Sequence, residues 1–316
     1  MDTTAMLIDV AILTPIIAVV GILAFSKKPN LREAISLIAG VTLLAINLKL
    51  YSSFNHGEVL SRQWLEILPG LNLSFRVDAL GLLFGLVASL LWPVTTLYAI
   101  GYMRGHNEDH QTRFYACFAI AIAAVMAIAY AENLFTLFIF YEVLSLCTYP
   151  LVTHAGTEKA KKGGRVYLGI LMGTSIAFFL PAIIITWLVA GTLDFQQGGI
   201  FPEQTPIALL SLLLVLFVFG VAKAAVMPFH RWLPAAMVAP TPVSALLHAV
   251  AVVKAGVFSL IKILVFIFGL DTLQQIPVSD YLLYLAGAGV VLASLIAMRQ
   301  DNLKARLAYS TISQLG

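Results

Sequence analysis

The sequence predicts an all-α, polytopic transmembrane helix bundle of about ten spans. Hydrophobic residues make up 60% of the 316 residues, charged residues only 11%, and the mean hydropathy is +0.93. This composition is typical of proteins that lie mostly inside a bilayer. The apolar residues also fall in separate runs of about 20 residues, which is the length that a helix needs to cross the hydrocarbon core.

Nine apolar runs are long enough to span a bilayer, and a tenth begins near Leu303. The predicted spans are 5–25, 32–51, 79–101, 114–131, 133–153, 166–190, 207–227, 242–268 and 281–298. The first run is too long for a signal-peptide core and has no small-residue cleavage site, so we expect it to be retained.

Four prolines separate the seventh span from the eighth: Pro228, Pro234, Pro240 and Pro242. Proline lacks a backbone donor and clashes with the preceding turn, so these residues exclude one continuous helix. We expect a short piece at about 229–238 to continue the seventh span as its second half. Carbonyls freed at such a break must bond to protein or water.

Lysine and arginine residues predict the orientation in the membrane. The loops after spans 1, 3, 5, 7 and 9 hold thirteen of them, and the opposite loops hold only Arg62 and Arg76. Because positive residues collect in cytoplasmic loops, we expect the N-terminus to lie outside and the odd-numbered loops inside.

Three ionisable side chains fall near the middle of predicted spans: Glu142, Lys223 and Lys254. A charge at that depth is costly unless it has a partner or water, and such groups commonly mark ion pathways. Glu142 and Lys223 are a candidate pair, which could be part of an ion path or a static pair that joins two helices. Lys49 lies near a helix end and is expected to snorkel. For Lys262, the sequence favours neither snorkelling nor an interior position.

His248 is the only histidine within a predicted span, six residues before Lys254. A neutral imidazole can relay protons near physiological pH. It can equally be a core histidine bonded to a backbone carbonyl. The six-residue spacing places the two residues about 9 Å apart along a helix, on different faces.

Other polar features indicate no metal or cofactor. His106 and His110 have helical spacing but lie in a short loop, where a solvated turn is the simpler interpretation. Cys117 and Cys147 both lie in apolar runs and are interpreted as small buried hydrophobes. No phosphate-binding loop or nucleophile arrangement is recognisable, so we expect no cofactor and no active centre belonging to the chain itself.

The sequence resembles the antiporter-like proton-translocating subunits that are shared by respiratory complex I, Mrp-type sodium/proton antiporters and membrane-bound hydrogenases. The resemblance runs from about the third span to the last residue. The stretches that carry it are Lys223–Gly256, Tyr141-Glu142, the linker from Tyr102 to Tyr115, and Leu303–Gly316. Tyr141 stands where tryptophan is common in the family.

The resemblance implies a division of the chain and roles for its polar residues. Residues 1–113 would form the N-terminal helices, 114–268 a first five-helix unit, and 281–316 the start of a second, inverted unit. In the family, a glutamate matching Glu142 pairs with a lysine matching Lys223. A residue matching His248 or Lys254 then passes protons toward the second unit. We expect the native product to continue, or a second antiporter-like chain to pack against the last spans.

The expected function is therefore proton translocation within a complex I-like, hydrogenase-like or Mrp-type assembly. The alternative is a non-conducting membrane subunit that docks partners or helps to form a quinone site. Expected partners are other integral membrane subunits, homologous chains among them, the lipid bilayer and, in a redox complex, a peripheral arm. Nucleic acid is not an expected partner, and the expected location is the inner membrane of a prokaryote.

Overall fold

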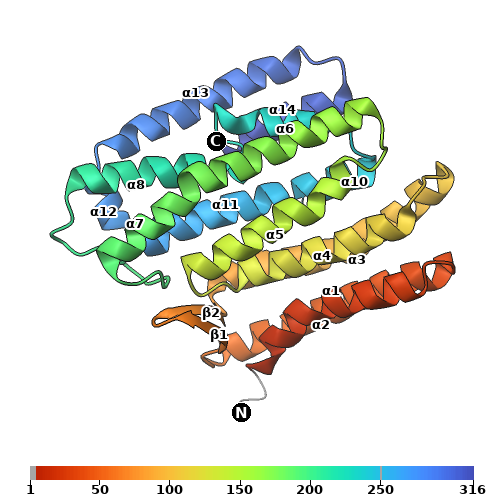
Figure 1. Cartoon of the computed structure of the whole chain (residues 1–316), viewed down its shortest axis with the longest axis horizontal. Helices are drawn as coiled ribbons and strands as arrows, with labels where there is room; N and C mark the ends of the chain where they lie inside the picture. The colour runs from red at the N-terminus through yellow and green to blue at the C-terminus, as the bar shows by residue number, and fades with distance from the viewer. Residues whose placement is uncertain (1–4, 250) are drawn as a thin grey trace. The chain divides into compact units, whose positions relative to one another are not determined.

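This computed structural model describes the backbone of residues 5–249 and 251–316, and their side chains except those of residues 246–249 (Figure 1). The α-helices are α1 Met6–Ala24, α2 Pro29–Asn55, α3 Ala79–Gly105, α4 Gln111–Ala129, α5 Leu134–Val152, α6 Glu158–Thr174, α7 Leu180–Ala190, α8 Ile207–Gly220, α9 Trp232–Ala236, α10 Thr241–Ala249, α11 Val252–Ile263, α12 Leu270–Gln275, α13 Val278–Met298 and α14 Leu303–Leu315. Short π-helical turns are η1 Ser175–Phe179 and η4 Leu264–Phe268, and short 3₁₀ turns are η2 Ala222–Ala224 and η3 Phe229–Arg231.

Within the described residues, seven helical segments are long and apolar enough to cross a membrane. One of them joins α6, η1 and α7 into a stretch from Glu158 to Ala190, and α8 is a shorter apolar helix. The predicted all-α polytopic bundle is therefore confirmed.

The chain forms two compact units. The first comprises Met1–Ala160 and Ala239–Ala255, and the second comprises Lys161–Val238 and Gly256–Gly316. In the first unit, α4 packs against α1, α3 and α5, and α2 packs against α1 and α3. Most of α4 is buried, because its many alanines allow neighbouring helices to approach closely.

A β-hairpin in the first unit joins α2 to α3, where the sequence suggested only a connecting loop. Strands β1 Ser61–Leu68 and β2 Leu71–Arg76 pair antiparallel, with Leu68 opposite Leu71 around a Pro69-Gly70 turn. Gly70 has φ of +82°, the conformation that a type II turn requires at its third position. The Trp64 ring packs on buried Phe75, and Asp9 of α1 accepts hydrogen bonds from Arg62 and Trp64.

The second unit contains α7 to α9, the larger parts of α6 and α11, and α12 to α14. Its α8 packs against α7, η1 and α13, and α14 packs against α13 and α9. The predicted seventh span reached residue 227, but α8 ends at Gly220. Residue 166 was the predicted start of the sixth span, but α6 begins at Glu158, with Lys159, Lys161 and Lys162 in its first turns.

Candidate functional site

The helix that leads to Lys223, α8, ends before the first of the four prolines. After α8 ends at Gly220, the chain turns through η2, and Ala225 takes a left-handed conformation with φ of +58°. A Cβ atom at Gly220 would lie 2.5 Å from the backbone nitrogen of Phe179, the last residue of the π-helical turn η1. The break is therefore packed against a second irregular segment, and π-helical turns are frequent at functional sites.

The four prolines lie further along the interrupted region. Pro228 precedes η3, and Pro234 is the third residue of the short helix α9. Pro240 precedes α10, in which Pro242 is the second residue. These positions keep α9 to five residues. The segment from 229 to 238 therefore forms two short helical pieces, η3 and α9, instead of one longer helix.

Lys223 lies inside the break itself, in the 3₁₀ turn η2, and its side chain is fully buried. The indole Nε1 of Trp232 donates a hydrogen bond of 2.9 Å to the carbonyl oxygen of Ala222, which satisfies one carbonyl of the broken helix. Gly256 of α11 packs against the same turn. A Cβ atom there would lie 2.3 Å from the nitrogen of Ala224 and 2.4 Å from the carbonyl carbon of Lys223.

A second lysine, Lys262 near the end of α11, is also fully buried. Its ammonium lies 4.7 Å from the ring centroid of Phe195 and 5.4 Å from that of Phe258. Such contacts stabilise a cation that has lost water. The interior position of Lys262 was not distinguished in the sequence, although Phe258 four residues earlier is on the same helical face.

Glu142 lies in α5, which belongs to the first unit. Both of its carboxylate oxygens are buried, and among the described residues neither accepts a hydrogen bond. An ionised carboxylate in such surroundings is costly unless a cation or water approaches it. Glu142 and Lys223 belong to different compact units, so their pairing stays a prediction.

The two remaining candidates lie on consecutive helices. His248 is in α10, but its side chain lies outside the described side chains. Lys254 is the third residue of α11, and its side chain is exposed, in contrast to Lys262 on the same helix. Its exposure shows that depth along a helix does not by itself determine burial.

A histidine that the sequence did not single out is buried beside the turn between α3 and α4. His154 follows α5, and its side chain is 2% exposed. Its Nε2 lies 4.0 Å from Glu108, and Arg113 donates a hydrogen bond to its carbonyl oxygen. Burial, and then the positive charge of Arg113, lower the pKa of the His154 ring, while Glu108 acts in the opposite direction.

We therefore expect the protein to lose stability in mild acid through His154. Because its folded-state pKa is below the ordinary value of about 6.5, this contribution is fully present above that pH and is lost as the pH falls through the folded pKa. His154→Phe should flatten the fall in melting temperature between roughly pH 7.5 and 5, a range that spans the ordinary histidine pKa. His56→Phe, at an exposed position, should show the same acid-dependent fall in melting temperature as the wild type. An unchanged acid profile in His154→Phe would contradict this assignment.

Comparison with known proteins identifies the family. The family described as NADH:quinone oxidoreductase/Mrp antiporter, transmembrane, matches residues 131–316, more than half of the chain. The chain belongs to this antiporter family. Glu142, Lys223, His248, Lys254 and Lys262 all lie within the matched range, whereas α1 to α4 and the β-hairpin precede it.

Relatives within the antiporter family are longer than this chain. A Rhizobium meliloti protein, named as a probable K(+)/H(+) antiporter subunit, is 33% identical over 98% of this chain and 31% of its own length. The Mrp complex of Dietzia sp. DQ12-45-1b contains a chain with 29% identity and a TM-score of 0.78, over 97% of this chain and 33% of that one. The chain spans about a third of the length of the curated relatives that it matches.

The fold also occurs in an archaeal respiratory complex. The membrane-bound sulfane sulfur reductase contains a chain that matches with a TM-score of 0.84 and 22% identity, over 100% of this chain and 63% of that one. This likeness shows a shared fold. The chain is thus a multi-pass membrane protein of the antiporter family.

Proposed function

We propose that this chain is an ion-translocating, antiporter-like membrane subunit of a multisubunit complex, and that the complex is a Mrp-type cation/proton antiporter. The observation that carries the proposal is Lys223, a fully buried lysine within a broken helix. Broken helices are a common way to build ion sites within a membrane. The Mrp-type assembly is supported by the names of a 33% identical relative and of a structural neighbour with 29% identity.

In this proposal, Lys223 takes up and releases protons. Its amine is buried, so the ammonium form needs a counter-charge or ordered water nearby. The irregular backbone from 221 to 228 supplies polar groups that can hold such water. Glu142, whose buried carboxylate oxygens accept no hydrogen bond from the described residues, is the proposed counter-charge. When that charge is withdrawn, Lys223 passes its proton on toward His248 or Lys254.

Lys262 has a different proposed role. Two aromatic rings contact its ammonium, which favours a cation that stays in place. Lys254, in contrast, is exposed, so transfer through it requires another polypeptide segment or partner protein to cover it. We therefore propose homologous membrane subunits among the partners. The proposed location is the inner membrane of a prokaryote. The proposed driving force is the gradient of the exchanged cation.

The test of this function is transport by the intact protein with its co-purifying subunits in sealed vesicles. An imposed sodium or potassium gradient should drive a pH change that a fluorescent pH indicator inside the vesicles reports. If the partners are all membrane proteins, the Mrp-type assembly is supported, whereas iron–sulfur proteins would instead indicate a redox complex. A fully assembled complex that moves no protons would support the non-conducting structural role and contradict the proposal.

Orientation is tested by single cysteines in a background where Cys117 and Cys147 are replaced by alanine. We propose that the N-terminus lies outside. Lys162→Cys, exposed at the start of α6, should react with an impermeant maleimide only from the cytoplasmic side. Gln197→Cys, exposed after α7, should react only from outside. The cysteine is placed at Gln197 and not at the neighbouring Gly198, because the φ of +87° at Gly198 disfavours any side chain. The reverse pattern would contradict the orientation.

A further inference from the structure

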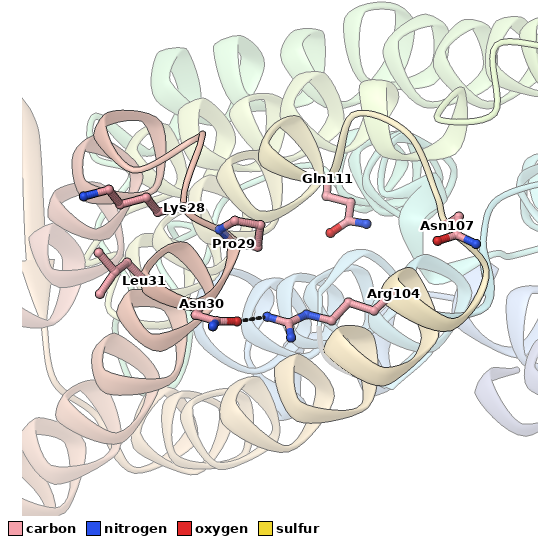
Figure 2. A pocket seen from close by; sticks show the side chains of 7 residues that line it. All are labelled: Lys28, Pro29, Asn30, Leu31, Arg104, Asn107 and Gln111. Carbon is pink, nitrogen blue, oxygen red and sulfur yellow. Dashed lines mark hydrogen bonds between the residues drawn. The ribbon is translucent and has the colours of Figure 1, made fainter.

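A hollow of about 690 Å³ opens in the first compact unit, where two helical turns meet (Figure 2). One side is formed by the α1–α2 turn and the start of α2, and the other by the end of α3, the α3–α4 turn and the start of α4. The lining residues are Lys28, Pro29, Asn30, Leu31, Arg104, Asn107 and Gln111. Among these seven residues, two are basic and none is acidic.

A charge network around a buried carboxylate fixes one wall of this hollow. The buried Glu33 accepts hydrogen bonds from Nε and Nη2 of Arg104 and lies 3.4 Å from Nη2 of Arg32. The Nη2 atom of Arg104 also donates to Oδ1 of Asn30 at 2.6 Å, the bond drawn across the hollow in Figure 2. Two arginines share one carboxylate, so the network keeps a net positive charge.

The positive charge is accessible and the negative charge is hidden. The Arg104 side chain is 45% exposed, whereas that of Glu33 is 4% exposed. Lys28 adds a second cation at the rim, with its ammonium extended outward in Figure 2. The long helices α2 and α4 both begin at the hollow, with Pro29 and Gln111, and helix N-termini favour anions.

An apolar surface adjoins these cations. Leu31 lines the hollow and is 45% exposed, and Phe25 in the same turn is 40% exposed. Further along α1 and α2, large apolar side chains are exposed as well, among them Ile17, Val20, Ile38 and Val41. Both helices are membrane spans, so this face is suited to acyl chains. A ligand that matches both parts has an anionic head and an apolar tail.

We propose that this hollow binds the phosphate group of an anionic phospholipid, with the acyl chains along the exposed faces of α1 and α2. Basic pockets between transmembrane helices recognise lipid head groups in this way. The phosphate would bind Arg104 and the amide of Asn107, and the long Lys28 side chain, which extends away from Arg104 in Figure 2, would turn toward it. A free phosphate ion offers the same head-group chemistry, but makes no use of the apolar surface.

Variants for the test leave Arg104 in place, because its loss would strip the buried Glu33 of a partner. Lys28→Glu and Asn107→Asp each introduce a negative charge at the lining. Lys159→Glu is the matched control, since it makes the same change at an exposed lysine in the first turn of α6. Melting temperatures of the intact protein in neutral detergent would establish that all three variants remain folded.

The measurement is binding of fluorescent phosphatidylglycerol to the intact protein at about 0.15 M salt, where remote charges are largely screened. Asn107→Asp should weaken binding by about fivefold, the effect of one charge near an anionic lipid, and Lys28→Glu, which changes the charge by two units, should weaken it more. Lys159→Glu should bind like the wild type, and labelled phosphatidylcholine should bind weakly to all of them.

Two results would overturn the proposal. The first is equal phosphatidylglycerol affinity in the wild type, Lys28→Glu and Asn107→Asp. The second is displacement of the lipid by inorganic phosphate as effectively as by unlabelled phosphatidylglycerol, which would show a free-anion site with no role for the acyl chains.

Discussion

Replacing Lys223 by methionine should abolish proton transport while the protein still folds and assembles. Methionine roughly preserves the volume of the side chain, and an apolar group fits a position that is fully buried. What is lost is the proton-carrying amine. We expect transport to fall by roughly two orders of magnitude, the scale of a positioned proton-transfer group. The measurement is cation-driven pH change in vesicles, normalised to assembled complex.

Lys49→Met is the matched control, because it removes the same group from an exposed position in α2. It should transport normally. Normal transport by fully assembled Lys223→Met would exclude this lysine from the proton path.

Glu142→Gln extends the experiment to the proposed counter-charge. It should also impair transport, and the double variant should be little worse than either single variant, because both residues would act on one transfer step. A static ion pair predicts a different pattern. Each single change would then destabilise assembly by about 3–5 kcal/mol, and the neutral double variant would recover it. Measuring assembly and transport for all four proteins separates the two cases.

The sequence predicted those features of the fold that follow from hydropathy and proline chemistry. Apolar runs locate the spans, because a bilayer rewards any helix of sufficient length and apolarity. The four closely spaced prolines exclude one continuous helix between the seventh and eighth spans. Single prolines are accommodated inside α1, α3 and α5. Lys223 is noticeable in the sequence because lysine is rare within an apolar run.

Features set by contacts distant in sequence could not be predicted in this way. The end of α8 at Gly220 involves a close approach to Phe179, forty-one residues earlier. Lys262 and Lys254 are both lysines in one helix, yet only the former is enclosed by Phe195 and Phe258. Hydropathy does not record which face of a helix meets a neighbour.

The β-hairpin illustrates a weaker local signal. Its strands alternate imperfectly, and the pairing has irregularities after Gln63 and after Glu66. Hydrogen bonds from a residue outside the hairpin also hold strand β2 in place. The side chain of Asn133, which caps α5, donates to the carbonyl of Asn72 and the hydroxyl of Ser74. Such support depends on a residue that is far away in the sequence.

Gly256→Ala should strongly destabilise the broken-helix region. The new methyl group would lie 2.3 Å from the nitrogen of Ala224 and 2.8 Å from Cβ of Lys223, well inside van der Waals contact. The obstructing atoms are mostly backbone, so relief requires α11 and the turn η2 to separate. We expect a loss of about 1–3 kcal/mol in the free energy of unfolding, and a larger one for Gly256→Val.

Gly287→Ala provides the matched control for Gly256→Ala. Gly287 lies in the transmembrane helix α13 of the same unit, and no atom of the described residues lies within 4 Å of a Cβ atom placed there. Alanine should therefore be neutral or stabilise that helix by up to about 1 kcal/mol. The readouts are thermal unfolding in detergent and the fraction of intact protein recovered from membranes. Equal melting temperatures for Gly256→Ala and the wild type would contradict the close approach of α11 to the turn that holds Lys223.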